Sequence, residues 1–350
     1  MPTSAVCKGS LGHTCLLTGS TNMEVAREVA VRLRTRLTPV VVRKFPVGEI
    51  HTEIQKSVRA KEAFVLATAN TGRINDDLME TKILLQTLRL ASVRDIFLLM
   101  LAMPYQRQDR KDRPRVPITA VLAIQELCNA AGGKMQSLVT FDPHTLGAEG
   151  FMSAVGIPAP AALSTKSLFV DYLKRTFPLN RLLLIPPDIG RTKWVASIAK
   201  KIYGEKEYFL HYLPVEKVRV GDELLTYIYE RKIDEIRNKK LTFKDKEVVI
   251  LDDMIDSGRT IRNISYKLAA MPEKPRSISA AAVHGYFTGT APENFEKDPT
   301  IDQVIVTNTL NIPKSSRFSK LKILDVSQLV AEIISRIVNK ESLEGYSTEI

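Results

Sequence analysis

Short apolar runs, several of them rich in β-branched residues, alternate along this chain with longer segments whose apolar residues recur at helical spacing. The first pattern is typical of strands buried on both faces, and the second of amphipathic helices. Strands are predicted at residues 15–18, 40–45, 63–68, 95–103, 137–141, 181–185, 248–251, 277–284 and 304–307. Helices are predicted at residues 23–36, 78–91, 117–131 and 167–176, and from Ile261 onward. This alternation favours an α/β fold with parallel sheets.

Composition limits the class of protein. The chain has 350 residues, of which 44% are hydrophobic and 25% charged, as in a globular protein with room for two domains. Its longest strongly apolar run, Ile96–Met103, is too short to span a bilayer. We expect no secretory signal, because no charged segment leads into an apolar one at the start. Cys7, Cys15 and Cys128 have neither metal-ligand nor redox spacing, which indicates a reducing, cytosol-like compartment.

The net charge of +11 fits nucleic acid, anionic lipid or small phosphorylated ligands as partners. Its densest basic cluster, Arg107–Arg115, is not interleaved with aromatic residues, which argues against single-stranded nucleic acid. We therefore expect neither nucleic acid nor membrane as a partner. The cluster follows a predicted strand, where open α/β sheets place ligands, and arginine forks suit polyphosphate. A solvated basic loop is the simpler alternative.

The most informative stretch follows the strand at 248–251. Asp252 and Asp253 come first, and Asp256–Thr260 then leads into a predicted helix. A strand, a loop and a helix N-terminus together bind phosphate through backbone N–H groups and the helix dipole. Paired carboxylates at the end of a strand suit ribose hydroxyls or a hydrated Mg²⁺. An ordinary strand-to-helix turn is the alternative, although two adjacent carboxylates cannot both cap one helix.

A second pair of charged residues, Lys217 and Arg219, stands two positions apart in a segment with extended character. On a strand, both side chains would point the same way. The polar segment 223–246 that follows is longer than a tight connection needs. It suits a loop that closes over a substrate, and equally a surface helix at about 225–239.

Several of these segments resemble motifs of the ribose-phosphate pyrophosphokinases, also called PRPP synthetases. The matching segments are Phe45–Ile50, Tyr105–Lys111, Phe141–His144, Pro186–Arg191, Leu213–Asp222 and Asp252–Thr260. Their order and spacing, over roughly residues 14–343, carry the resemblance more than any single motif. It implies two tandem type I phosphoribosyltransferase-like domains, each a mainly parallel sheet flanked by helices.

Composition along the chain, together with the resemblance, indicates where the domains lie. We expect a loose tail at residues 1–13, an N-terminal domain at 14–160 and a C-terminal domain at 161–320, with the crossover near 157–163. Residues 321–350 would carry a last helix that packs back on the N-terminal domain.

The implied reaction transfers the β,γ-pyrophosphoryl group of ATP to the 1-hydroxyl of ribose 5-phosphate, giving PRPP and AMP for nucleotide biosynthesis. By resemblance, the catalytic residues are Lys217 and Arg219. The implied ATP-binding residues are Phe45, Glu49, Arg107, Gln108, Asp109 and Lys111. The implied ribose-5-phosphate residues are Asp252, Asp253, Asp256, Ser257, Gly258 and Thr260. The implied ligands of the Mg²⁺ cofactor are His144 and Asp188.

A cytoplasmic oligomer is implied as well. It would be a homo-oligomer built from dimers, up to a hexamer, or a hetero-oligomer with related subunits. In that assembly the segment around Phe45 would reach a neighbouring subunit's ATP site.

Among the positions that depart from the family pattern, three alter a motif, with Val47 in place of aspartate and Arg191 and Arg259 in place of glycines. They favour an alternative, a catalytically impaired regulatory subunit that assembles with active relatives. The retained Lys217 and Asp252 oppose it. A phosphoribosyltransferase that consumes PRPP is a weaker alternative, because such an enzyme needs no ATP motif.

Overall fold

The computed structural model describes residues 13–145, 147–213, 215–220, 223–228 and 243–348, and for 215–220 and 223–228 the backbone only. The chain packs into two compact units. The first continues to Thr165 and also takes in Asn308–Asn311 and Asp325–Thr348. The second consists of Lys166–Thr307 and Ile312–Leu324. Residues 1–12 of the predicted tail lie outside the described residues.

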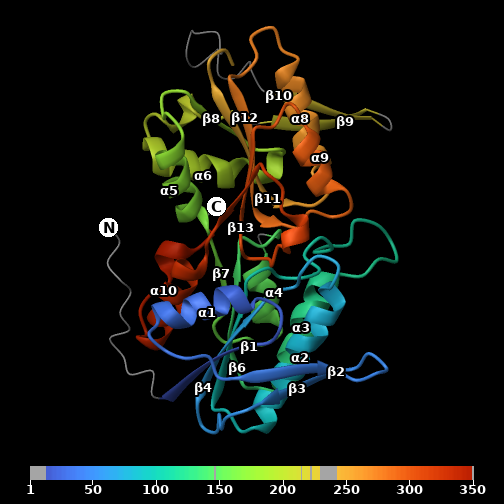
Figure 1. Cartoon of the computed structure of the whole chain (residues 1–350), viewed down its shortest axis with the longest axis vertical. Coiled ribbons are helices and arrows are strands. Elements are labelled where there is room, and N and C mark those ends of the chain that lie inside the picture. The colour runs from blue at the N-terminus through green and yellow to red at the C-terminus, as the bar shows by residue number, and fades with distance from the viewer. Residues whose placement is uncertain (1–12, 146, 214, 221–222, 229–242, 349–350) are drawn as a thin grey trace. The chain divides into compact units, whose positions relative to one another are not determined.

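The first unit is built on a five-stranded parallel sheet (Figure 1). Its strands, in spatial order, are β1 (Thr14–Thr18), β4 (Glu62–Ala67), β5 (Asp95–Met100), β6 (Met135–Phe141) and β7 (Ala161–Leu163). Its helices are α1 (Met23–Arg32), α2 (Ile74–Leu90), α3 (Thr119–Ala131), α4 (Ala148–Ala154) and α10 (Ser327–Val338). Helices α2 and α3 pack together, as do α1 and α10, so both faces of the sheet are covered.

The second unit repeats this plan. Its five parallel strands, in spatial order, are β14 (Leu321–Leu324), β13 (Gln303–Thr307), β12 (Ser277–Gly285), β11 (Glu247–Ile255) and β8 (Leu182–Ile185). Its helices are α5 (Lys166–Thr176), α6 (Thr192–Tyr203), α8 (Arg259–Ala269) and α9 (Ala291–Lys297). In each sheet the strands lie side by side in chain order. The α/β fold with two mainly parallel, helix-flanked sheets is therefore confirmed.

Alternate residues of β11 show why its apolar run is unbroken. Val248 and Ile250 pack in the core that α8 and α9 cover, whereas Val249 and Leu251 pack in the core that α5 and α6 cover. A central parallel strand is buried on both faces, so neither set of positions can be polar. The run of apolar residues predicted this strand for the right physical reason.

The first unit also contains a short antiparallel hairpin of β2 (Val40–Lys44) and β3 (Ile50–Ile54). Strand β3 was not predicted, because its sequence mixes polar and apolar residues and its burial comes from packing against α2. The short elements β7 and α4 were missed as well. Strand β7 pairs with β6, so part of the expected crossover at 157–163 belongs to the first sheet. The predicted domain limits themselves stay predictions.

Several predicted boundaries and one predicted element were wrong. Helix α1 ends at Arg32 instead of residue 36, and strand β5 ends at Met100 instead of residue 103. Helix α2 begins at Ile74 instead of residue 78, so Asn75, Asp76 and Asp77 lie in its first turn. Strand β11 runs to Ile255, so Asp252 and Asp253 lie within the strand, near its end. The alternative helix at about 225–239 is wrong where it can be checked, because residues 223–228 form β10; residues 229–239 lie outside the described residues.

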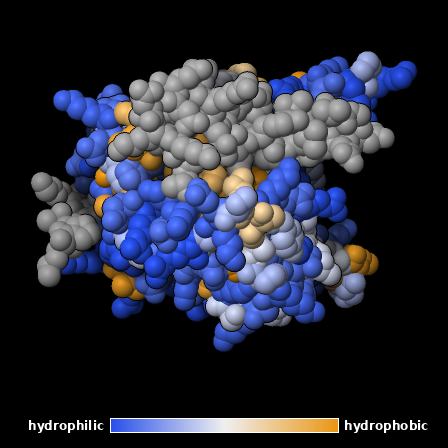
Figure 2. Space-filling view, turned by 90° about the horizontal axis from the view of Figure 1, so that it is seen from above, coloured by the Kyte–Doolittle hydropathy of each residue, from blue (hydrophilic) through white to orange (hydrophobic). Residues whose placement is uncertain are grey.

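Hydrophilic residues cover most of the described surface seen in Figure 2, and apolar residues form small separate patches on it. Many large apolar side chains are instead fully buried, among them Phe64, Phe141, Phe169 and Phe295. Within the part of the chain that the structure describes, no helix combines the length and the apolar character needed to cross a membrane.

Candidate active site

Strands β8 and β11 bring the carboxylates of the second unit to one edge of its sheet. They are parallel neighbours, with Ile185 opposite Ile250. Asp188 follows Ile185 by three residues, and Asp252 and Asp253 follow Ile250 by two and three. Because parallel strands end at the same edge, all three aspartates lie where α/β sheets bind ligands. This placement agrees with the edge that the sequence predicted.

The side chain of Arg191 contacts the carboxylates of the two adjacent aspartates, Asp252 and Asp253. It belongs to the short 3₁₀ helix η2 (Ile189–Arg191), which follows β8. Its Nη2 is 3.0 Å from Oδ2 of Asp253, and its Nε is 4.0 Å from Oδ1 of Asp252. The Arg191 side chain is 13% exposed and that of Asp253 is 4% exposed, so water screens this ion pair little. The sequence marked Arg191 only as a departure from the family pattern and did not indicate this contact.

The surroundings of Asp252 disfavour its ionised form. Its Oδ1 accepts the backbone N–H of Asp253 at 2.8 Å. Burial, together with the negative charges of Asp253 and Asp188, raises the pKa of Asp252 well above its ordinary value. A carboxyl in this environment gains from a hydrogen-bond donor or a cation beside it. The site is therefore suited to a ligand with hydroxyl groups, such as a sugar.

The loop that follows β11 is positioned by two features. The hydroxyl of Thr288 donates to Asp256, and the backbone N–H of Thr288 donates to the Asp256 carbonyl at 3.1 Å. Gly258 has φ +72°, and a Cβ there would lie 2.5 Å from the ring of Phe295. Only glycine fits this position. Thr288 was not predicted, since nothing near it in the sequence points to the loop.

Helix α8 begins at Arg259 with no side-chain cap and no acidic residue in its first turn. The positive end of its dipole is therefore available to an anion. Ser257 is exposed and Thr260 is half-buried beside it. Arg259 is exposed and has helical backbone angles, so arginine does not strain the loop at this position.

The predicted catalytic pair lies on a hairpin of the second unit. Strand β9 (Val215–Val220) pairs antiparallel with β10 (Glu223–Ile228), with Lys217 opposite Thr226 and Arg219 opposite Leu224. The backbone of β9 approaches η2, which carries Arg191. The side chains of Lys217 and Arg219 lie outside what the structure describes.

In the first unit, the predicted ATP loop follows β5 and the predicted histidine follows β6, the next strand of the sheet. Both therefore leave the sheet at the same edge. Arg107, Gln108 and Lys111 are exposed and Asp109 is half-buried. The Gln108 carbonyl accepts the N–H of Ala120 at 3.2 Å, and its side-chain Oε1 accepts the Thr119 hydroxyl at 3.1 Å. The loop is thus anchored on α3 while its cations face solvent.

Asp142 organises the segment that carries His144. It is buried, and its carboxylate accepts the Ser164 hydroxyl at 2.8 Å and both the N–H and the hydroxyl of Thr165 at 2.7 Å. Sequence reasoning did not assign it a role, although its position at the strand end, two residues before His144, was a usable signal. His144 is half-buried in the first unit, whereas Asp188 belongs to the second. Their sharing of one Mg²⁺ stays a prediction.

The hairpin β2–β3 presents Phe45 to solvent. The N–H of Phe45 donates to the Glu49 carbonyl, and the N–H of Gly48 donates to the Phe45 carbonyl, each at 2.8 Å. Gly48 has φ +94°, which this tight turn requires. Phe45 is 52% exposed, with its ring edge-on to His51. An aromatic ring displayed in this way can stack on a nucleotide base.

The donor chemistry fits Mg²⁺. Among the described residues, no three acidic, histidine or cysteine side chains converge in a metal-binding cluster. Mg²⁺ is commonly held by one or two carboxylates together with substrate phosphates and water. Asp188, with Asp252 and Asp253 on the neighbouring strand, supplies oxygen donors of that kind.

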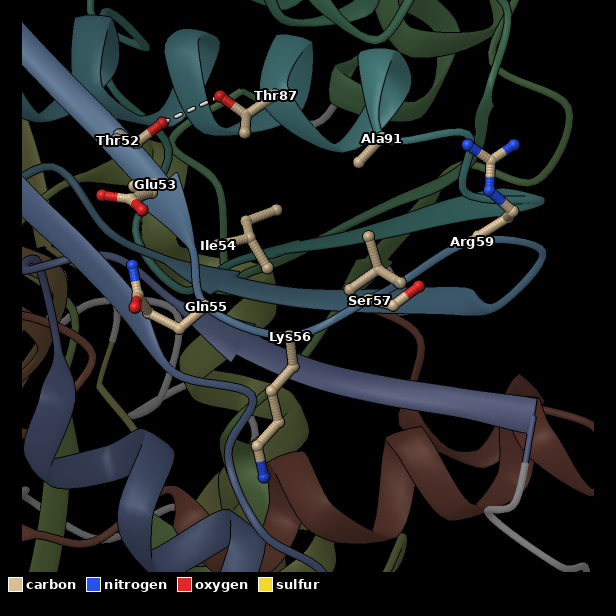
Figure 3. A pocket seen from close by; sticks show the side chains of 10 residues that line it. Thr52, Glu53, Ile54, Gln55, Lys56, Ser57, Arg59, Thr87 and Ala91 are labelled. Carbon is tan, nitrogen blue, oxygen red and sulfur yellow. Dashed lines mark hydrogen bonds between the residues drawn. The ribbon is translucent and has the colours of Figure 1, made fainter.

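A separate surface pocket of about 460 Å³ lies between β3 and α2 (Figure 3). A hydrogen bond of 2.9 Å joins the hydroxyls of two of its lining residues, Thr52 and Thr87. The side chains of Lys56 and Arg59 point in different directions in Figure 3. They do not converge on one ligand position, so we assign no function to this pocket.

Comparison with known proteins gives a consistent picture. The model for the N-terminal domain of ribose phosphate pyrophosphokinase matches residues 14–132, and that for the phosphoribosyl synthetase-associated domain matches residues 243–347. The chain is similar to the ribose-phosphate pyrophosphokinase of Campylobacter jejuni, with 33% identity over 94% of this chain and 97% of that protein. It is 30% identical to ribose-phosphate pyrophosphokinase 3 of Saccharomyces cerevisiae, over 94% of this chain and 95% of that protein.

A solved structure agrees. The phosphoribosylpyrophosphate synthetase from Mycobacterium smegmatis matches with a TM-score of 0.80 and 28% identity. The match covers 94% of this chain and 99% of that one.

Proposed function

Because this chain belongs to the ribose-phosphate pyrophosphokinase family, we propose that it transfers the β,γ-pyrophosphoryl group of ATP to the 1-hydroxyl of ribose 5-phosphate, giving PRPP and AMP. One arrangement carries the proposal. A half-buried carboxylate, Asp252, and a buried one, Asp253, lie on β11 a few residues before a helix N-terminus that has no side-chain cap. A sugar phosphate offers hydroxyl donors to the first feature and an anion to the second.

The residues of the second unit divide these tasks. Asp252 and Asp253 accept hydrogen bonds from the ribose hydroxyls. Asp256 to Thr260 hold the 5-phosphate, and Gly258 gives this loop the positive φ that it needs beside Phe295. Lys217 and Arg219 stabilise the charge that spreads over the transferring group, because phosphoryl transfer depends on positioning and electrostatics more than on a covalent nucleophile.

The nucleotide side of the reaction belongs to the first unit in this proposal. Arg107 and Lys111 pair with the ATP phosphates, and Gln108 and Asp109 position the nucleotide beside them. Arginine suits this task because its planar fork donates two hydrogen bonds to one phosphate. Mg²⁺, when bound, neutralises phosphate charge; His144 and Asp188 are the residues proposed to hold it.

The chain is further proposed to act in the cytoplasm as an oligomer, in which Phe45 and Glu49 complete the ATP site of a neighbouring subunit. The solvent-exposed ring of Phe45 supports this assignment. So does Val47, which is 81% exposed at the same turn. Large apolar side chains at an exposed turn are typical of contact surfaces.

The test is AMP formation from ATP by the purified chain, with and without ribose 5-phosphate. We expect AMP only when the sugar phosphate is present. No AMP under either condition would contradict the proposal and would support a regulatory subunit that needs an active relative.

A matched variant tests the catalytic pair. Lys217→Ala should lower kcat by orders of magnitude with little change in the KM for ATP, because a cation that acts on the transition state contributes little to ground-state binding. Steady-state kinetics on both substrates measure this. Wild-type kcat in the variant would remove Lys217 from the mechanism.

A further inference from the structure

The edge of the second sheet that carries Asp188, Asp252 and Asp253 also carries a positively charged side chain, that of Arg191. Asp188, Asp252 and Asp253 bring three carboxyl groups to the ends of two neighbouring strands. Arg191 brings one positive charge to the same place, in contact with Asp253 and close to Asp252. These are the oxygen donors that suit a divalent cation.

We propose that Arg191 is a positioning residue that occupies the Asp252–Asp253 pair in the ligand-free protein. A divalent cation then binds this pair strongly only after a sugar phosphate has drawn the arginine away. The inference rests on the proposed function, because it takes ribose 5-phosphate as the ligand of this edge.

Charge repulsion is the first reason. A guanidinium whose Nη2 is 3.0 Å from Asp253 lies where a metal ion would have to bind. Two cations cannot share a nearly buried carboxylate at low cost, because their repulsion is weakly screened there. Arg191 therefore lowers the intrinsic affinity of the pair for a divalent cation.

A phosphorylated ligand offers Arg191 another partner. A guanidinium forms two parallel hydrogen bonds with phosphate as readily as with a carboxylate. Arginine has a long side chain, and Arg191 is the last residue of η2, one short turn that leads directly into α6. Rotation of the side chain can thus move the guanidinium from carboxylate to phosphate without a change in the fold.

The backbone at this position does not depend on the arginine. Arg191 has φ −97° and ψ −5°, which any residue adopts. Substitutions there should leave η2 intact, so effects on binding can be assigned to the side chain. Two variants then separate the charge of the side chain from its shape. Arg191→Lys keeps the positive charge and changes the shape, whereas Arg191→Gln removes the charge.

The experiment measures Mn²⁺ binding to the full chain by electron paramagnetic resonance, without nucleotide, with and without ribose 5-phosphate. Without the sugar, Arg191→Gln should bind Mn²⁺ about tenfold more tightly than wild type, or about 1.4 kcal/mol. Arg191→Lys should stay near wild type because it keeps the charge. Ribose 5-phosphate should tighten Mn²⁺ binding to wild type much more than to Arg191→Gln.

Two controls locate the effect. Arg262 pairs with the fully buried carboxylate of Asp298 at 2.8 Å in the same unit, so Arg262→Gln removes a comparable charge elsewhere. It should leave Mn²⁺ affinity unchanged. Adding Asp253→Asn to Arg191→Gln should abolish the gained affinity. Thermal melting of each variant checks that it is folded, and Arg191→Gly serves if Arg191→Gln is not.

Equal Mn²⁺ affinity in wild type and Arg191→Gln without sugar would overturn the inference. So would an equal gain in Arg262→Gln, which would show a general charge effect. If ribose 5-phosphate fails to tighten Mn²⁺ binding to wild type, displacement by the sugar is wrong. The proposed function fails separately, through absence of AMP formation, which leaves the Mn²⁺ comparison of the variants readable.

Discussion

The second strand of each sheet is followed by a loop and a helix. The two loops differ in whether an acidic residue of the helix accepts hydrogen bonds from the loop. Each loop has a glycine with positive φ just before or at the start of its helix: Gly72 at +75° after β4 and Gly258 at +72° after β11. After β4, Asp77 of the helix folds back and accepts the N–H of Asn70 at 2.9 Å and the Nε of Arg73 at 3.1 Å. After β11, helix α8 has no acidic residue in its first turn.

The first unit satisfies its loop donors with its own carboxylates. Glu80 does the same for the turn after β1, where it accepts the N–H and the hydroxyl of Ser20, each at 2.6 Å. A side chain at Gly19 would collide with Glu80, since a Cβ there would lie 2.0 Å from its oxygen. The same α/β arrangement thus carries a different kind of loop in each unit. In the first unit acidic side chains accept hydrogen bonds from the loops, whereas in the second we propose that the loop binds a ligand anion.

Removing the internal carboxylate should give the largest change in stability. Asp77→Ala leaves the buried donors of Asn70 without their acceptor, so unfolding should become easier by about 1–3 kcal/mol. Denaturant unfolding measures this. Asp76→Ala is the matched control, because the neighbouring Asp76 pairs with Lys44 at 2.5 Å on the surface and should change little. Equal losses in both variants would contradict the comparison.

Asp253→Asn should instead affect the reaction more than the fold. We expect kcat/KM for ribose 5-phosphate to fall by about a hundredfold or more, roughly 2.7 kcal/mol of lost transition-state stabilisation. Its melting temperature should fall less than that of Asp77→Ala, because Asp252 remains 4.0 Å from Arg191. Intact kinetics with a large loss of stability would show that Asp253 serves the fold.

Asp252→Asn should stabilise the protein at neutral pH. The native pKa of Asp252 is raised, chiefly by burial, so its ionisation weakens the folded state as pH rises above the unfolded value of about 3.9. That cost is complete only above the native pKa, and asparagine removes it. Calorimetric melting should show a higher Tm for the variant at pH 8 and a gain that shrinks toward pH 4. A gain that grows on acidification would have the wrong sign.

Arg259→Gly should have the smallest effect. Arg259 is exposed and starts α8 with helical angles, so it neither strains the loop nor blocks the approach to Gly258. We expect the KM for ribose 5-phosphate to change by less than about threefold, as for a screened surface charge. Repeating the titration at high salt separates a cation effect from a steric one. Activity that appears only in the glycine variant would show that Arg259 silences the wild-type chain.

Sequence alone determined the features that depend on neighbours along the chain. The strand cores were predictable because a strand buried on both faces must be apolar throughout. Gly258 and the loop before α8 were predictable because a strand, a glycine and a helix start leave a local signature. The order of the motifs predicted the family without any knowledge of their contacts.

Tertiary structure decided the features that join distant segments. The Arg191–Asp253 ion pair depends on β8 lying beside β11, and strand pairing across dozens of intervening residues leaves no local mark in the sequence. For the same reason, the sequence could not show that Glu80 accepts hydrogen bonds from Ser20, 60 residues away. Whether a buried carboxylate serves the fold or a ligand depends on which donors the packed chain brings to it.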